Sequence, residues 1–108
     1  MKLLEQWRLE TGDAVALLGY DESDTNYVHS VLEGRERLRG KDVRDRIFHL
    51  YGVRRSLRFL FQDLETENAW LREPHQELNG KSPMSLLRSG SMESLLAVKD
   101  YVDIFAGR

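Results

Sequence analysis

Residues 63–87 have the sequence DLETENAWLREPHQELNGKSPMSLL, which contains both prolines of the chain and predicts a helix, a break and a second helix. Asp63 is placed to cap the first helix, and the acids after it favour a helix N-terminus. Pro74 ends that helix, because a proline disfavours helical angles in the residue before it. Ser82 and Pro83 begin the second helix with a hydroxyl at the N-cap and a residue that has no N–H group to leave unpaired. This stretch predicts helical structure and offers no catalytic group.

The segment between these two helices is expected to be a loop over residues 75–81. Asn79-Gly80 is its turn dipeptide. Trp70 and Leu71 fall on the apolar side of the first helix. We therefore expect these two side chains to lie in the core and to hold the loop in place.

The segment before this stretch, residues 42–62, carries apolar residues at steps of three, four and seven, which predicts one long amphipathic helix. Four aromatic residues widen its apolar face: Phe48, Tyr51, Phe59 and Phe61. We expect most of them in the core, and the alternative is a self-association surface. Leu64 continues the spacing of the apolar stripe.

The segment after the stretch ends in a further helix, for which Ser91 is placed as the N-cap. Four residues form its buried stripe: Leu95, Val98, Val102 and Phe105. Asp100 and Asp103 are expected on the exposed side of this helix. Such a helix either closes a bundle or offers a ridge to a partner.

Residues 1–41 predict three short helices, with a break at Thr11-Gly12, a polar turn at residues 21–24 and a stop at Gly34. Two short helices joined by a tight turn are typical of a helix-turn-helix, although any small helical bundle gives the same pattern. The whole chain is thus predicted to be all-α. The long helix 42–62 would join the helix-turn-helix-like region 1–41 to the C-terminal part 63–108.

A basic connector follows the third of these helices and suggests contact with DNA. Its cations, expected at phosphates, are Arg35, Arg37, Arg39 and Lys41. Base contacts would come from the polar residues of the helix before it, Asn26, His29 and Ser30. The alternative is a solvated loop that Glu36 partly neutralises.

Composition excludes several classes of protein. The chain has 108 residues, of which 41% are hydrophobic and 31% charged, so it is too apolar to be disordered. It has no cysteine, which excludes a disulfide framework and a thiol nucleophile, and its three histidines show no spacing typical of a metal site. No run is long enough to span a bilayer, so we expect a cytoplasmic protein with no membrane partner and no cofactor.

Charge is unevenly distributed along the chain, although the net charge is only -2. Residues 33–58 hold nine basic and four acidic side chains, a balance of +5, whereas residues 63–108 hold five basic and eight acidic side chains, a balance of -3. A basic middle and an acidic end indicate two surfaces with different partners.

The segment NAWLREPHQELNGKSPMSLL at residues 68–87 resembles the core motif of the toxin-binding domain of antitoxins of the Xre/MbcA/ParS type. The matching positions are Asn68, Ala69, Trp70, Leu71, Pro74, Leu78, Gly80, Lys81, Ser82 and Leu86. Asn79 stands where the family has a second glycine, and asparagine tolerates the left-handed angles that such a turn needs. A weaker match extends from about Leu50 to Tyr101.

The resemblance implies a partner and a site. The family pairs with RES-type toxins, which resemble ADP-ribosyl transferases and consume NAD, and its C-terminal part covers the entrance to the toxin's NAD pocket. The residues expected to touch the toxin are Lys81, Asp100, Tyr101, Asp103 and Ile104. Those expected to form the structural core of the motif are Trp70, Leu71, Pro74, Gly80, Ser82 and Leu86.

Two binding functions follow, and the sequence contains no constellation of catalytic residues that would favour an enzyme. The first is an antitoxin that neutralises a RES-type toxin and represses its own operon through operator DNA. The alternative is a dimeric helix-turn-helix regulator without a toxin partner. The aromatic excess of the long helix, and the two-fold symmetry common among helix-turn-helix proteins, favour a homo-oligomer in both cases.

Overall fold

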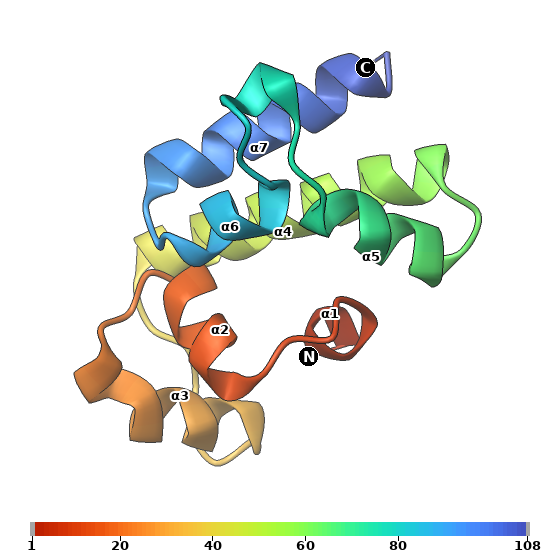
Figure 1. Ribbon diagram of the computed structural model, residues 1–108. Coiled ribbons are helices and arrows are strands. Elements are labelled where there is room, and N and C mark those ends of the chain that lie inside the picture. Colours follow the sequence, from red (N-terminus) through yellow and green to blue (C-terminus); the bar gives the residue numbers. More distant parts are fainter. Residues whose placement is uncertain (1, 108) are drawn as a thin grey trace.

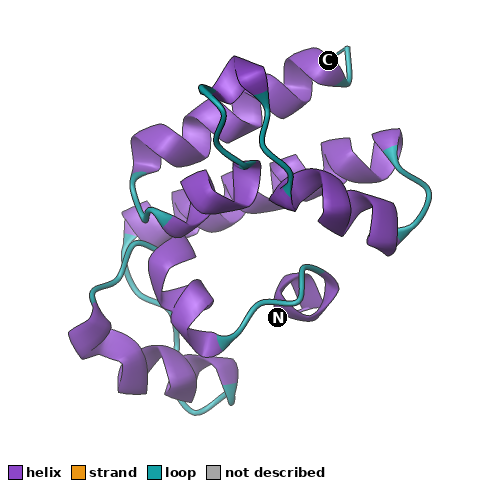
Figure 2. Ribbon diagram, viewed as in Figure 1, coloured by secondary structure: helices purple, strands orange, loops and turns teal. Residues whose placement is uncertain are grey.

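The computed structural model describes residues 2–107, and within this range the chain is built from α-helices and two short 3-10 turns (Figures 1 and 2). The elements are α1 (Lys2–Gln6), α2 (Thr11–Leu17), η1 (Glu22–Asp24), α3 (Thr25–Leu32), α4 (Lys41–Leu60), α5 (Leu64–Arg72), η2 (Gln76–Leu78), α6 (Pro83–Arg88) and α7 (Met92–Phe105). The all-α prediction is confirmed. No helix within residues 2–107 combines the length and the apolar character needed to cross a membrane.

The long helix α4 forms the centre of the molecule, and α7 packs along it (Figure 1). The short helix α6 contacts α2, α5 and α7. One large core cluster draws side chains from α1, α2, α4, α5, α6 and α7, among them Leu3, Leu50, Leu71 and Val98, and includes Trp7, which directly follows α1. The N-terminal helices α1 and α2 therefore share a core with the C-terminal part, while a second, smaller cluster lies between α2 and α3.

Helix starts in the C-terminal half follow the predicted caps. The side chain of Asp63 accepts a hydrogen bond from Thr66 N at 2.7 Å and begins α5. The hydroxyls of Ser82 and Ser91 accept from the backbone N–H three residues on, at 3.1 Å and 3.0 Å. Each cap satisfies a backbone donor that the first helical turn leaves unpaired. α5 ends at Arg72, just before Pro74, as predicted.

The break between the first two helices lies before the predicted site. Thr11 and Gly12 belong to the first turn of α2, and the chain reverses over residues 7–10, where Arg8 adopts a φ of 56°. The carboxylate of Asp13 accepts a hydrogen bond from Glu10 N at 3.0 Å, which makes Glu10 the helix N-cap. The expected break at Thr11-Gly12 is therefore wrong, because this acid three residues into α2 fixes its start at Thr11.

The connection between α2 and α3 spans residues 18–24 and includes η1. A helix-turn-helix joins its two helices by about three or four residues, so the tight turn that we expected is not formed here. Asp21 caps η1, and α3 follows directly at Thr25. The two helices still pack against each other through Val15 and Val28.

The four aromatic residues predicted on the long helix divide into two pairs, and one of them, Phe61, follows the last residue of α4. Tyr51 and Phe61 pack against the core, whereas Phe48 and Phe59 are 71% and 73% exposed. The expectation of burial is therefore wrong for Phe48 and Phe59, because they lie on the side of α4 opposite the buried Leu50 and Leu57. α4 ends at Leu60, so Leu64 falls in the first turn of α5 and does not continue the stripe of α4.

Candidate functional site

Trp70 lies at the centre of an aromatic cluster that joins α5, the loop after it and α7. Its ring stacks on that of Tyr101, with centroids 5.7 Å apart and planes 12° apart. His75 lies 4.6 Å away, and Phe61 and Phe105 both lie 5.9 Å away. Trp70 is buried, as predicted, and such ring pairs add to the stabilisation that burial provides.

The loop between α5 and α6 is closed by main-chain hydrogen bonds. His75 N donates to Lys81 O at 3.1 Å, and Gly80 N donates to His75 O at 2.9 Å. Asn79 and Gly80 have φ angles of 58° and 78°, so both occupy the left-handed region that favours asparagine and glycine. The prediction that Asn79 keeps the turn is confirmed.

His75 ties this loop to α7. Its Nε2 lies 3.1 Å from Trp70 O, a carbonyl that can only accept, so this nitrogen carries the proton and Nδ1 accepts from the Tyr101 hydroxyl at 3.1 Å. Burial, followed by the nearby carboxylate of Glu77, raises the pKa of Tyr101 above its ordinary value. Tyr101 was predicted to contact the toxin, and its ring and hydroxyl are engaged within the chain.

The outward side of α7 combines apolar residues with one acid. Leu96, Asp100 and Ile104 follow one another at intervals of four residues, so they share one helix face, which we call the α7 outer face. All three are exposed, Ile104 to 77%. Phe105 was expected in the buried stripe of this helix, but its side chain is 53% exposed. It lies in the last turn of α7, and its aromatic contacts are with the rings of Trp70 and Tyr101. Apolar residues bordered by polar ones are typical of protein interfaces, which have an apolar centre and a polar rim.

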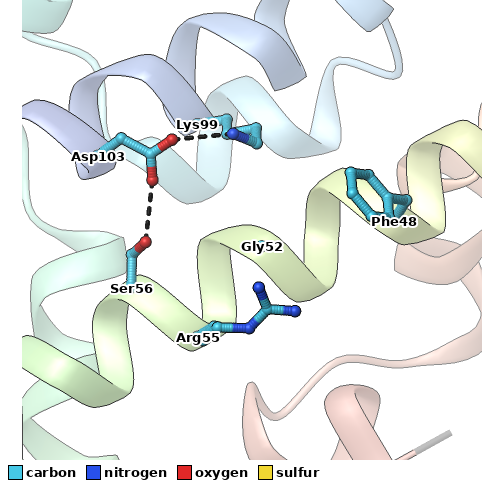
Figure 3. A pocket seen from close by; sticks show the side chains of 6 residues that line it. All are labelled: Phe48, Gly52, Arg55, Ser56, Lys99 and Asp103. Carbon is cyan, nitrogen blue, oxygen red and sulfur yellow. Dashed lines mark hydrogen bonds and ion pairs between the residues drawn. The ribbon is translucent and has the colours of Figure 1, made fainter. Parts of the chain in front are cut away.

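Asp103 does not lie on this outer face. Its carboxylate accepts hydrogen bonds from Ser56 Oγ at 2.9 Å and from Lys99 Nζ at 2.8 Å, and its side chain is only 26% exposed (Figure 3). The expectation that Asp103 is exposed beside Asp100 is therefore wrong. Asp103 follows Asp100 at an interval of three positions, and this spacing turns Asp103 towards α4.

The residues expected to form the core of the motif occupy different environments. Leu71 is fully buried, and Leu86 is half-buried against the core. Pro74 is exposed and begins the loop, whereas Ser82 acts through its cap on α6. Lys81, at the end of the loop, is exposed. Trp70, Tyr101 and the loop thus form one support, and the α7 outer face adjoins it.

Three polar residues of α5 dock onto the end of α1, and the sequence did not point to this contact. Asn68 Nδ2 donates to Gln6 O at 2.7 Å, and an Arg72 nitrogen donates to Trp7 O at 2.6 Å. These carbonyls are left without helical partners at the end of α1. Glu67, one of the acids after Asp63 that were expected to favour the helix N-terminus, is fully buried and accepts a hydrogen bond from Trp7 Nε1. A buried tryptophan needs an acceptor, but sequence alone does not identify which residue supplies it.

The predicted DNA-contacting residues lie on or after α3. Asn26 and His29 are exposed, and Ser30 is half-buried. The cations are exposed, and three of them have acidic neighbours: Arg35 pairs with Glu33, Arg39 with Glu36 and Lys41 with Asp45. Arg37 contributes its carbonyl, which accepts from the Tyr27 hydroxyl. Exposed ion pairs of this kind are weak, so phosphates are able to displace the acids.

Arg58, near the end of α4, pairs with the buried Glu67. Its Nε lies 3.1 Å from Glu67 Oε1. Arg58 thereby supplies the positive charge that a buried carboxylate requires.

Two comparisons bear on the family. Residues 56–108 match the family model described as the antitoxin Xre/MbcA/ParS C-terminal toxin-binding domain. The chain is also 26% identical over 106 residues to y4oB, an uncharacterised protein of Sinorhizobium fredii, in a match that covers 98% of this chain and 80% of that protein. The matched segment begins within α4 and contains the Trp70 cluster, the loop and α7.

Proposed function

We propose that this chain neutralises a cognate RES-type, NAD-consuming toxin, because residues 56–108 match the Xre/MbcA/ParS family of antitoxin toxin-binding domains. The C-terminal part binds over the entrance to the toxin's NAD pocket. A pocket that receives a phosphate-bearing cofactor is expected to be basic at its mouth, and residues 63–108 carry a net charge of -3.

The α7 outer face is the observation that carries this proposal. Ile104 presents the most exposed large apolar side chain of residues 2–107, and Asp100 lies one turn before it. In the complex, Ile104 inserts into an apolar site at the pocket mouth, and Asp100 pairs with a cation of the toxin. Lys81, exposed at the end of the loop, makes a second polar contact.

Tyr101 and Asp103 take supporting roles in this proposal. Tyr101 holds the loop against α7 through His75, and Asp103 fastens α7 to α4 through Ser56. A surface that is already rigid loses less conformational entropy when it binds. We therefore assign the direct contacts to Lys81, Asp100 and Ile104.

Repression of the operon is the second part of the proposal. The region 1–41 would contact operator DNA through exposed Asn26 and His29, while the cations of residues 35–41 contact phosphates. The long α2–α3 connection departs from the usual helix-turn-helix, so we place more weight on phosphate contact than on base recognition. A regulator without a toxin partner remains the alternative, and the absence of a toxin gene beside this one would favour it.

The experiment is coexpression of this chain with the product of its neighbouring gene, tested as a RES-type toxin, with cell growth and cellular NAD as measurements. The wild-type chain should preserve both. The double variant Asp100→Ala, Ile104→Lys should lose protection and allow NAD to fall. Glu65→Ala is the matched control, because Glu65 is an exposed acid in the first turn of α5, away from α7.

Point variants are preferable to a truncation after Lys99. Such a truncation removes Val102, which is fully buried, and Tyr101, which stacks on Trp70, so it would disturb the fold. Protection by the folded double variant equal to that of the wild type would refute the assignment of the surface. Failure of the wild-type chain to protect against the adjacent toxin would refute the antitoxin function itself.

A further inference from the structure

The C-terminal half of α4 carries a hollow that neither part of the proposed function uses. It has a volume of about 290 Å³ and is lined by Tyr51, Arg54, Arg55 and Arg58. We call these four residues the arginine hollow. Sites for small molecules usually measure roughly 300–1,000 Å³, so this hollow suits a compact ligand or one group of a larger ligand.

Two of its arginines have no acidic partner. Arg54 and Arg55 form no ion pair among residues 2–107. The basic connector differs, because Arg35, Arg39 and Lys41 each pair with an acid. Like charges on neighbouring turns of a helix repel one another and destabilise it. An anion in the hollow would relieve this repulsion.

Arg58 adds donors to the hollow although it has a partner. Its Nε lies 3.1 Å from Glu67 Oε1, and its terminal nitrogens form no hydrogen bond among residues 2–107. The three guanidinium charges, less the charge of Glu67, leave a balance of +2. The helix dipole favours a cation only in the last turn, so it explains Arg58 but not Arg54 and Arg55.

Tyr51 supports one side of the hollow. Its ring packs against the core, and the guanidinium carbon of Arg54 lies 5.7 Å from the ring centroid. A guanidinium is attracted to the face of an aromatic ring. Arg54 is therefore partly held in place before a ligand arrives, which lowers the entropy that binding costs.

We propose that the arginine hollow binds the diphosphate group of a small anion. A guanidinium engages phosphate oxygens two at a time, and a diphosphate has enough terminal oxygens for each of the three arginines. A carboxylate has oxygens for only one such contact. The balance of +2 complements an anion with at least two negative charges. A compact anion also fits the hollow better than duplex DNA does, because the phosphates of DNA are spread along its axis.

The first test is calorimetric titration of the purified full chain with inorganic diphosphate and, separately, with inorganic phosphate. Ionic strength is held constant, and divalent cations are left out because they bind phosphates themselves. The wild type should bind one diphosphate per chain, and phosphate roughly tenfold more weakly. Similar affinities for the two anions would overturn the proposal, since a single phosphate would then satisfy the hollow.

The second test compares two double variants of equal charge. Arg54→Gln with Arg55→Gln should weaken diphosphate binding roughly tenfold and leave helical circular dichroism unchanged. Arg35→Gln with Arg39→Gln removes the same charge from the connector and should bind diphosphate as the wild type does. Equal losses in both variants would mean unspecific attraction and overturn the proposal. If the first variant loses helical signal, Arg55→Gln alone decides, because that side chain is exposed, and it should still weaken binding.

ADP and adenosine distinguish the sources of the diphosphate group. Affinity for ADP no higher than that for inorganic diphosphate identifies the free anion, and higher affinity for ADP identifies a nucleotide. Adenosine should not bind, and binding of adenosine as tight as that of ADP overturns the proposal. Absence of binding by both diphosphate and ADP at about 1 mM also overturns it, and loss of DNA binding in the Arg54, Arg55 double variant would then assign these arginines to DNA. Neither the toxin nor the operator is needed to measure diphosphate binding, so this inference and the proposed function fail or stand separately.

Discussion

Trp7 Nε1 donates a hydrogen bond of 2.7 Å to Glu67 Oε2, and neither residue has any exposed surface. The two residues are 60 positions apart, so this bond fastens the segment just after α1 to α5. Arg58 Nε completes the site at 3.1 Å from the other carboxylate oxygen. A buried carboxylate requires such donors, and the loss of one leaves an oxygen without a partner.

We expect Trp7→Phe to destabilise the protein more than the loss of ring area suggests. The variant removes a hydrogen bond to a charged group, which contributes about 1.5–3 kcal/mol. Urea unfolding followed by circular dichroism measures the difference. Glu65→Gln changes an exposed acid of the same helix and should stay within about 0.5 kcal/mol of the wild type. Equal stabilities of Trp7→Phe and Glu65→Gln would argue against a structural role for the Trp7–Glu67 bond.

Local features of the fold were predictable from the sequence, whereas long-range polar contacts were not. Asp63, Ser82 and Ser91 act as caps because each bonds to a backbone group three residues away, which sequence order alone determines. The Trp7–Glu67 bond depends on how α1 packs on α5, and no local pattern encodes that. The exposure of Phe48 likewise depends on which side of α4 the other helices cover.

The candidate site was also predictable only where it depends on local helix geometry and not on the packing of one helix against another. The helical interval of four groups Asp100 with Ile104, and both are exposed. Asp103 lies on a neighbouring side of α7, and its orientation becomes evident only once α7 packs on α4.

The protein should become less stable at alkaline pH, because the hydroxyl of Tyr101 ionises. Burial, and then Glu77, raise the pKa of Tyr101 above 10.0, so the folded state favours the neutral phenol. Its contribution is complete below the unfolded pKa and is lost as pH rises through the folded pKa. We expect the free energy of unfolding to decline as pH rises above about 10, the ordinary pKa of tyrosine, and to decline less in Tyr101→Phe. Tyr20, whose pKa burial also raises, is present in both proteins and cancels in the comparison. Parallel pH profiles would contradict a special role for Tyr101.

Substitutions at Asp103 and at Asp100 should have different effects on the stability of the protein. Asp103→Ala removes the acceptor for Ser56 and Lys99, so it should lower the free energy of unfolding by about 1–3 kcal/mol. Asp100→Ala removes an exposed acid and should change stability by less than about 0.5 kcal/mol. Thermal unfolding of both variants provides the measurement. A larger loss of stability in Asp100→Ala than in Asp103→Ala would reverse these assignments.

Phosphate contacts by the basic connector should appear in the salt dependence of DNA binding. Replacing Arg35, Arg37, Arg39 and Lys41 by glutamine should weaken binding to operator and unrelated DNA alike. The slope of log K against log salt should flatten by about one unit for each lost contact. Fluorescence anisotropy with labelled duplexes at several salt concentrations measures this slope. If the wild-type chain does not bind DNA at low salt, either alone or with the toxin, the proposed DNA contact is refuted.

The most direct measurement for the α7 outer face is calorimetric titration of the purified chain into the proposed RES-type toxin partner, with and without a non-reactive NAD analogue. We predict that the analogue competes with the wild-type chain and that Ile104→Lys weakens binding at least tenfold, about 1.4 kcal/mol. Leu64→Lys, a change at an exposed leucine of α5, should bind as the wild type does. Unchanged affinity of Ile104→Lys, together with indifference to the analogue, would contradict a C-terminal face that covers the NAD pocket.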